Sequence, residues 1–156
     1  MRLLATILLL LNVLYPAVAG EQKKTVEFLN SGSLLPEGLP FSEAVRVGNT
    51  LYLSGQLGIA PGTLTLVPGG IGAEAKQTLE NIRSTLQIYG YSMKDVVKCT
   101  VMLADIAEWP AFNEVYRDFF QPPYPARSAF AASGLAMGAR VELECMAAKA
   151  GTGDFD

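Results

Sequence analysis

An arginine and a glutamate on two successive strand-like segments are the residues of this sequence best suited to catalysis. Arg127 lies within the run PARSAF, residues 125–130, and Glu142 follows fifteen residues later within VELE, residues 141–144. A guanidinium group binds a carboxylate through two parallel hydrogen bonds. A carboxylate whose pKa is raised by burial can take a proton from water. If the two segments form a hairpin, the pair can bind a small carboxylate beside an activated water.

These residues and three others also have structural interpretations. Spacing alone favours a structural ion pair between Arg127 and Glu142 across the final hairpin, because cross-strand ion pairs are common. Such pairs contribute little to stability. Ser54 and Gly55 are typical of a strand end, yet a glycine also leaves the backbone open to a ligand. Asn113, on a predicted helix, is typical of a solvated amide or of a ligand contact. We keep Ser54, Gly55 and Asn113 as candidate substrate-binding residues.

The composition restricts the chemistry further. The sequence contains no histidine, which is the usual general base of Ser/His/Asp catalysis and the commonest transition-metal ligand. We therefore predict no metal site and no cofactor. Without Arg2, 11 basic side chains stand against 15 acidic ones, a net charge of −4. With no cluster of Lys or Arg to neutralise phosphates, nucleic acid is not expected as a partner.

The first nineteen residues have the pattern of a secretory signal peptide. A single charge, Arg2, precedes an apolar run at 3–11, and small residues at 17–19 form an A-x-A-like cleavage site. The run is too short and interrupted for a transmembrane helix of roughly 20 apolar residues, although an uncleaved amino-terminal anchor is the alternative. We expect residues 1–19 to be removed and 20–156 to form a single domain, exported to a periplasm or secreted, without stable membrane insertion.

Two cysteines, Cys99 and Cys145, lie inside apolar strand-like segments. An exported protein can pair them in a disulfide. The sequence favours two buried free thiols instead, because disulfides across a sheet require unusual geometry.

The elements that carry these residues alternate along the chain without repeats or linkers. The patterns predict strands at 26–29, 44–47, 50–56, 95–103, 128–132 and 140–148, and helices at 71–89 and 110–120. The Gly48-Asn49 pair predicts a tight hairpin turn, and Gly90 is suited to end the first helix. The order β-ββ-α-β-α-ββ indicates an α+β fold, a single sheet with two helices on one face.

The face of the sheet without helices has an unusual composition. In the strand at 95–103, Val97 is expected to point inward together with every second residue after it. The other face would present Lys98, Thr100, Met102, Glu142 and Glu144. This mixture is too polar for a core and too apolar for water, so we expect a closed oligomer. Trp109 and the other aromatic residues of the second helix are interpreted as packing residues.

Several motifs together resemble the RidA/YjgF family of enamine and imine deaminases. The signature with Arg127 and Glu142 is joined by PFSEAV at 40–45, SGQ at 54–56, LADI at 103–106 and FNEVY at 112–116. The similarity spans about residues 26–149. It implies a chorismate-mutase-like fold, assembled as a homotrimer whose sheets form a central barrel with clefts between subunits.

The resemblance also implies a reaction. Members hydrolyse 2-enamine or 2-imine carboxylates such as 2-aminoacrylate to a 2-keto acid and ammonia. By this resemblance Arg127 grips the substrate carboxylate, Glu142 positions the water, and Ser54, Gly55 and Asn113 line the cleft.

One cleft position differs from the family pattern. Phe41 stands where many members have tyrosine, so a hydroxyl is missing from the predicted substrate-binding residues, and a bulkier or more apolar substrate is expected. The alternative function is a non-catalytic protein that binds small carboxylates, or acts like a chaperone, through the same clefts.

Overall fold

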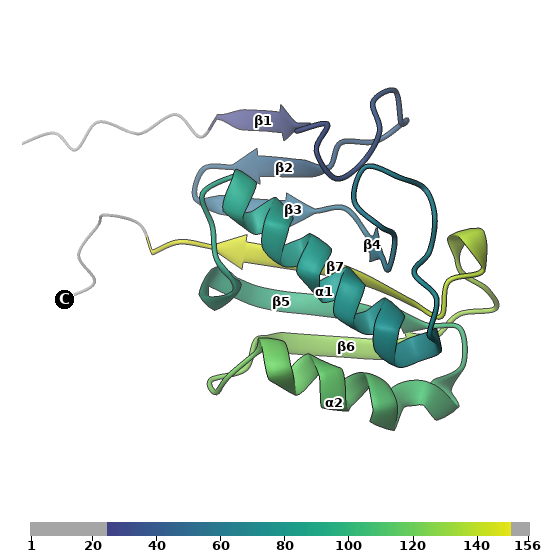
Figure 1. Cartoon of the computed structure of the whole chain (residues 1–156). Coiled ribbons are helices and arrows are strands. Elements are labelled where there is room, and N and C mark those ends of the chain that lie inside the picture. The colour runs from purple at the N-terminus through teal and green to yellow at the C-terminus, as the bar shows by residue number, and fades with distance from the viewer. Residues whose placement is uncertain (1–24, 151–156) are drawn as a thin grey trace, which may run out of the picture.

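The computed structural model describes residues 25–150, so the predicted signal peptide lies outside the described residues. Two helices cover one face of a seven-stranded sheet (Figure 1), which confirms the predicted α+β architecture. The strands are β1 (Val26–Leu29), β2 (Ala44–Val47), β3 (Thr50–Leu53), β4 (Gln56–Leu57), β5 (Val96–Leu103), β6 (Ala126–Ala131) and β7 (Val141–Ala148). The helices are α1 (Gly70–Ile88) and α2 (Trp109–Phe119), and three short 3-10 helices are η1 (Met93–Asp95), η2 (Ile106–Glu108) and η3 (Ala136–Gly138).

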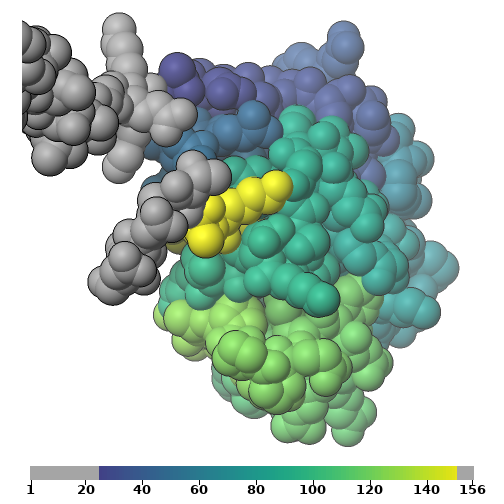
Figure 2. Space-filling model, turned by 90° about the vertical axis from the view of Figure 1, so that its left-hand side faces the viewer, coloured from purple at the N-terminus to yellow at the C-terminus, as the bar shows by residue number. Residues whose placement is uncertain are grey.

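The strands follow the order β1-β2-β3-β7-β5-β6, and β4 pairs separately with β7. In the space-filling view (Figure 2), the purple and blue part of the chain lies above the yellow carboxy-terminal part, with teal and green parts beside and below it. Within the described residues, β1 and β6 therefore form the two edges of the sheet. None of the helices in this range is long and apolar enough to span a membrane.

The helices form because their apolar residues repeat at helical spacing. On α1 the residues of the predicted stripe that contact the sheet, Ala75, Leu79, Ile82 and Leu86, are fully buried. Gly90 follows the helix with a φ of 83°, a conformation that costs glycine no steric strain.

The predicted hairpin is confirmed, but its second strand is shorter than expected. β2 and β3 pair antiparallel from Ala44↔Leu53 to Val47↔Thr50, and Gly48 adopts a φ of 57° in the turn. The strand predicted at 50–56 ends at Leu53. Ser54 and Gly55 separate it from β4, so both residues lie at a break in the sheet.

The final two strands do not form the predicted hairpin. β5 lies between them, paired parallel with β6 and antiparallel with β7. The reason is the helix between β5 and β6. A strand, a crossover helix and a second strand produce a parallel pair, and β7 then adds to the other edge of β5.

The inward position predicted for Val97 is also wrong. The register shifts between Val96 and Lys98, so Val97 is the extra residue of a bulge. Val96 is 6% exposed in the core, whereas Val97 is 46% exposed. The bulge inverts the alternation at the start of the strand, and the predicted pattern holds from Lys98 onward.

Cys99 and Cys145 form a disulfide, so the interpretation as free thiols is wrong. The two residues are directly opposite in the β5/β7 register, and both are buried in the core. Sequence separation concealed this relationship, because the two positions are 46 residues apart and α2 lies between them.

Candidate functional site

Arg127 lies on the helix-covered side of edge strand β6. Its register partner on β5 is Cys99, which is fully buried. The guanidinium carbon of Arg127 lies 4.5 Å from the ring centroid of Trp109 and 4.5 Å from that of Tyr116, both on α2. Among residues 25–150, Arg127 has no ion pair with an acidic side chain. The cation is half-buried and available to an external anion.

A cavity of about 430 Å³ lies beside this arginine. Its lining residues are Asn113, Tyr116, Arg117, Tyr124, Pro125 and Arg127. The cavity thus brings together two of the predicted site residues, Asn113 and Arg127. Its lining contains two guanidinium groups, an amide and no carboxylate, a composition suited to a small anionic ligand.

Glu142 lies on the opposite, uncovered face of the sheet. Its register partner on β5 is Met102, and its neighbours along β7, Val141 and Leu143, are fully buried in the core. Because successive residues of a strand point to opposite faces, the Glu142 carboxylate points away from the helices. Burial raises the pKa of Glu142, and the negative charge of Glu144 raises it further. Both effects move the pKa above the ordinary glutamate value, the direction that suits a carboxyl group acting as a general acid or base.

Gly55 lies directly against this carboxylate. A Cβ on Gly55 would be 2.0 Å from Oε1 of Glu142 and 3.0 Å from its Cδ. The hydroxyl of Ser54 donates a hydrogen bond to the carbonyl oxygen of Ser42 at 2.6 Å, and its N–H donates to the carbonyl oxygen of Glu43 at 3.1 Å. Ser54 therefore anchors the strand end, while Gly55 provides the space that Glu142 occupies.

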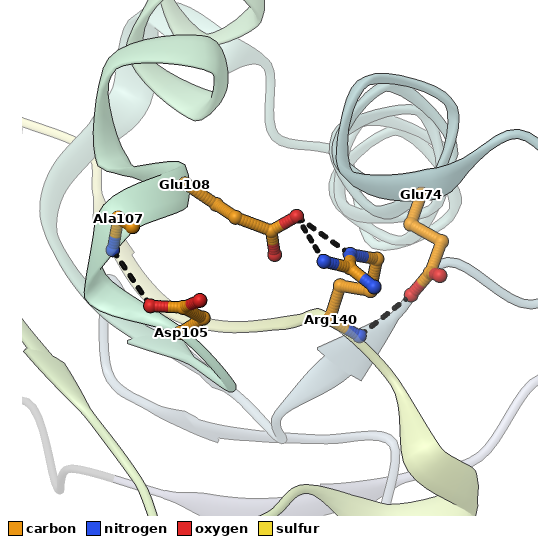
Figure 3. Close-up of polar contacts among 5 residues, drawn as sticks. All are labelled: Glu74, Asp105, Ala107, Glu108 and Arg140. Carbon is orange, nitrogen blue, oxygen red and sulfur yellow. Dashed lines mark hydrogen bonds and ion pairs between the residues drawn. The ribbon is translucent and has the colours of Figure 1, made fainter.

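The segment that leads into β7 is held by the polar cluster in Figure 3. The backbone N–H of Arg140 donates to Oε2 of Glu74 on α1 at 2.8 Å, and its Nε donates to Oε1 of Glu108 at 2.7 Å. Asp105 caps the adjoining 3-10 helix by accepting a hydrogen bond from the N–H of Ala107 at 2.9 Å. The strand that carries Glu142 is thereby tied to α1 and to η2, the 3-10 helix that leads into α2.

Phe41 lies elsewhere in the chain. It is 48% exposed and lines a separate cavity of about 180 Å³, together with Glu43 and the loop that precedes it. Within one chain it does not contribute to the cavity beside Arg127. The structure therefore brings Asn113 together with Arg127, and Gly55 together with Glu142, and leaves Phe41 apart from both pairs.

The two predicted catalytic residues do not converge within one chain. Arg127 and Glu142 flank β5 from either side, in register with Cys99 and Met102. This places them roughly 10 Å apart along the strands and two strand spacings, about 10 Å, across the sheet. Because their side chains also point to opposite faces, the predicted ion pair across a hairpin is wrong.

Trp109 and Tyr116 both contact Arg127, a relationship that the sequence analysis did not anticipate. Both were interpreted as packing residues, and Tyr116 is indeed 4% exposed. The available signal was their separation of seven residues, which places two aromatic rings on one face of a helix that also carries Asn113. Their contact with Arg127 was hidden because the parallel pairing of β6 with β5 was not anticipated. Among residues 25–150, no cluster of three or more His, Cys, Asp or Glu side chains could hold a metal ion.

Comparisons with known proteins place this chain in one family. The family model described as Endoribonuclease L-PSP matches residues 34–149, and the chain belongs to this family, which is also known as RidA/YjgF. The 2-iminobutanoate/2-iminopropanoate deaminase of Capra hircus is 49% identical over 108 residues, which cover 69% of this chain and 79% of that protein.

Solved structures give the same fold. RidA from Psychrobacter sp. PAMC 21119 is 37% identical, with a TM-score of 0.74 over 79% of this chain and 99% of that one. TdcF from E. coli, whose structure contains bound serine, is 28% identical, with a TM-score of 0.73 over 80% of this chain and 99% of that one.

Proposed function

We propose that this protein is an enzyme that hydrolyses 2-imino and 2-enamino carboxylates to 2-keto acids and ammonia. The observation that carries the proposal is Arg127, a half-buried cation that lines an anion-suited cavity and has no acidic partner among residues 25–150. The deaminase names of relatives that are 44% to 49% identical support the reaction. The serine bound in TdcF supports a ligand that carries a carboxylate next to a nitrogen.

The reaction needs one carboxylate anchor and one group that handles protons. Arg127 binds the substrate carboxylate through its planar N–H donors. Glu142 takes a proton from water as the water oxygen bonds to C2 of the imine, and a proton moves to the nitrogen, so that a carbinolamine forms. The hydroxyl of the carbinolamine then loses its proton, the C–N bond breaks as the C=O bond forms, and the nitrogen leaves as ammonia with that second proton. Burial, together with the negative charge of Glu144, raises the pKa of Glu142, which favours the protonated form that returns the proton. No cofactor is required for this sequence of steps.

The two halves of the site come together between copies of the chain. Arg127 and Asn113 lie at the edge formed by β6, whereas Gly55 and Glu142 lie on the uncovered face. A second copy that brings its uncovered face to the β6 edge supplies the missing half. The exposed apolar residues of that face, Phe28 and Phe130, are 72% and 49% exposed and favour burial in such an interface. A closed homotrimer, the assembly implied by the family resemblance, repeats this contact three times.

The disulfide supports the proposal that the protein is exported. Disulfides persist in oxidising compartments and are rare in the cytosol. Cys99 and Cys145 are the two cysteines of the sequence, and they are paired in the core. We also infer that the substrate is a small molecule and not RNA, although the family model is described as an endoribonuclease. The net charge of the protein is negative, and the sequence has no histidine that could act as the base in RNA cleavage.

The proposal is tested by deamination of freshly generated 2-imino acids, with the 2-keto acid and ammonia as readouts. Arg127→Ala is expected to lose at least about a hundredfold in kcat/KM, because a charge-assisted bidentate contact is removed. The matched control is Arg83→Ala, which removes another arginine stacked on an α2 ring, that of Phe119 at 5.5 Å, outside the cavity. Equal turnover by wild type and Arg127→Ala would contradict the role of Arg127. Carboxylate binding in calorimetry without turnover would instead favour the binding protein.

A further inference from the structure

The environment of Arg127 differs from that of the other half-buried arginine among the described residues, Arg46. Arg46 is paired with Glu27 at 3.2 Å and donates to the carbonyl oxygen of Tyr89 at 3.0 Å. Arg127 has neither kind of partner in residues 25–150, although a half-buried charge is costly to leave uncompensated. The contacts that replace them are two aromatic rings, each 4.5 Å from its guanidinium carbon.

The two rings occupy fixed positions on α2. Trp109 stacks on Phe112 with a centroid distance of 6.0 Å, and Tyr116 contacts Phe112 at 5.7 Å and Phe120 at 4.5 Å. Phe112 and Phe120 are buried in the core. Packing within this row of four rings holds Trp109 and Tyr116 in place. The two rings therefore provide a preorganised surface for the guanidinium group of Arg127.

Aromatic contacts leave the binding capacity of arginine intact. A ring attracts the face of the guanidinium through its quadrupole, whereas a carboxylate binds in the guanidinium plane through the N–H donors. The two interactions therefore do not compete, and an acidic partner in place of the rings would occupy the donors that the substrate needs. Burial raises the pKa of Tyr116, and the positive charge of Arg127 offsets part of this effect.

We propose that Trp109 and Tyr116 are positioning residues that hold Arg127 in the orientation that binds the substrate carboxylate. This inference rests on the proposed function, since it assigns how the carboxylate anchor of that reaction is oriented. The rings act on substrate binding through Arg127, which both of them contact. At Tyr116 the aromatic ring positions Arg127 and the hydroxyl does not, because the hydroxyl is buried without a hydrogen-bond partner among the described residues.

The test compares ring removal with hydroxyl removal at one position. Tyr116→Leu and Trp109→Leu are each expected to weaken binding of 2-oxobutanoate, the product of 2-iminobutanoate, about fivefold to thirtyfold in calorimetry. The same variants are expected to raise KM by similar factors with a smaller change in kcat. Tyr116→Phe keeps the ring and is expected to stay within about twofold of wild type. Recovery in the phenylalanine variant separates the ring's effect from general damage.

Tyr91→Leu is the matched control for lost packing. Tyr91 is also a buried tyrosine beneath a cation, with Lys149 Nζ 5.1 Å from its ring centroid, but it lies outside the Arg127 cavity. This variant is expected to lose stability and to retain 2-oxobutanoate affinity and KM. Trp109 is only partly buried, so its leucine variant is expected to fold even where Tyr116→Leu does not.

The outcomes separate this inference from the proposed function. Wild-type turnover with unchanged affinity and KM in both leucine variants overturns the positioning role alone. An equal loss in Tyr116→Phe and Tyr116→Leu also overturns it, since the hydroxyl would then carry the effect. Binding of 2-oxobutanoate that depends on both rings, without turnover of any 2-imino acid, supports the positioning role and overturns the enzyme. Absence of both binding and turnover in the wild type overturns both.

Discussion

The carboxylate of Glu142 fills the space that a side chain at Gly55 would occupy. A Cβ on Gly55 would lie 2.0 Å from Oε1 of Glu142, far below any tolerated contact. Glu142 can keep this position only while residue 55 is glycine, whereas the backbone conformation does not require glycine, because Gly55 is absent from the residues with positive φ. The break between β3 and β4 therefore serves to seat the Glu142 carboxylate.

Gly55→Ala is expected to lower turnover about a hundredfold, since a displacement of about 1 Å in a reacting group has an effect of that size. The free energy of unfolding is expected to change by no more than about 1 kcal/mol, because the end of a flexible side chain can move. Gly134→Ala is the matched control, since a Cβ there meets nothing within 4 Å and its φ is not positive. Steady-state kinetics and denaturant unfolding check both variants. A fully active Gly55→Ala enzyme would contradict the position assigned to Glu142.

Glu142→Gln is expected to separate activity from stability. Turnover is expected to fall about a hundredfold to ten-thousandfold, the usual contribution of a general base. Because the pKa of Glu142 is raised in the folded protein, this group favours folding below its unfolded pKa, and that contribution is lost as pH rises through the folded pKa. At pH 7 the glutamine variant is therefore expected to unfold at the same or a higher denaturant concentration. A clear loss of stability at pH 7 would contradict the direction of the pKa shift.

The acid limb of the pH profile tests the environment of the same carboxyl group. Burial is the first cause of the raised pKa of Glu142, and the negative charge of Glu144 is the second. The midpoint of the rise of kcat with pH is therefore expected above 4.5, the ordinary glutamate pKa. Glu144→Gln removes only the second cause, so it is expected to shift the limb to lower pH without abolishing turnover. The measurement is kcat between about pH 4 and 9. An unshifted limb would mean that Glu144 does not affect the titrating group.

The disulfide is expected to contribute to stability and not to chemistry. The bond joins residues 46 apart and lowers the chain entropy of the unfolded state, which stabilises the folded protein by about 2 to 4 kcal/mol. The double variant Cys99→Ala/Cys145→Ala is expected to lose about that much free energy of unfolding and to keep kcat at temperatures where it is folded. Alkylation of the denatured, unreduced protein provides a direct check, because a paired protein incorporates no label. Two labels per chain would identify free thiols.

The sequence predicts the local elements well because their signals are local. Helix α1 follows from the spacing of Leu79, Ile82 and Leu86, and the β2/β3 turn follows from Gly48, which adopts the positive φ that this residue pair suggests. These features depend on residues within a few positions of one another. The candidate pair Arg127 and Glu142 was also found in the sequence, through its motif.

The relationships between distant elements could not be obtained in the same way. The bulge at Val97 depends on how β5 meets β7 and leaves no mark in the alternation of residue types. The strand beside Arg127 is β5, paired parallel with β6, and not β7 as expected from a hairpin. As a result, Arg127 and Glu142 lie on opposite faces of the sheet. The roles of Trp109 and Tyr116 follow only from that pairing. In each case the deciding contact joins residues far apart in the chain.

Complementation between two inactive variants tests the origin of the site. Arg127 and Glu142 point to opposite faces of one chain, so we expect each active site to combine Arg127 of one copy with Glu142 of another.

Arg127→Ala and Glu142→Gln are each expected to be nearly inactive. If they are mixed in equal amounts after unfolding and reassembled together, random assembly leaves about one quarter of the sites with both functional residues. Activity is therefore expected to recover to about a quarter of wild type, whereas each variant refolded alone stays inactive. No recovery in mixtures whose chains have exchanged, as verified by mass spectrometry of the assemblies, would place both residues in one subunit's site and contradict the proposed arrangement.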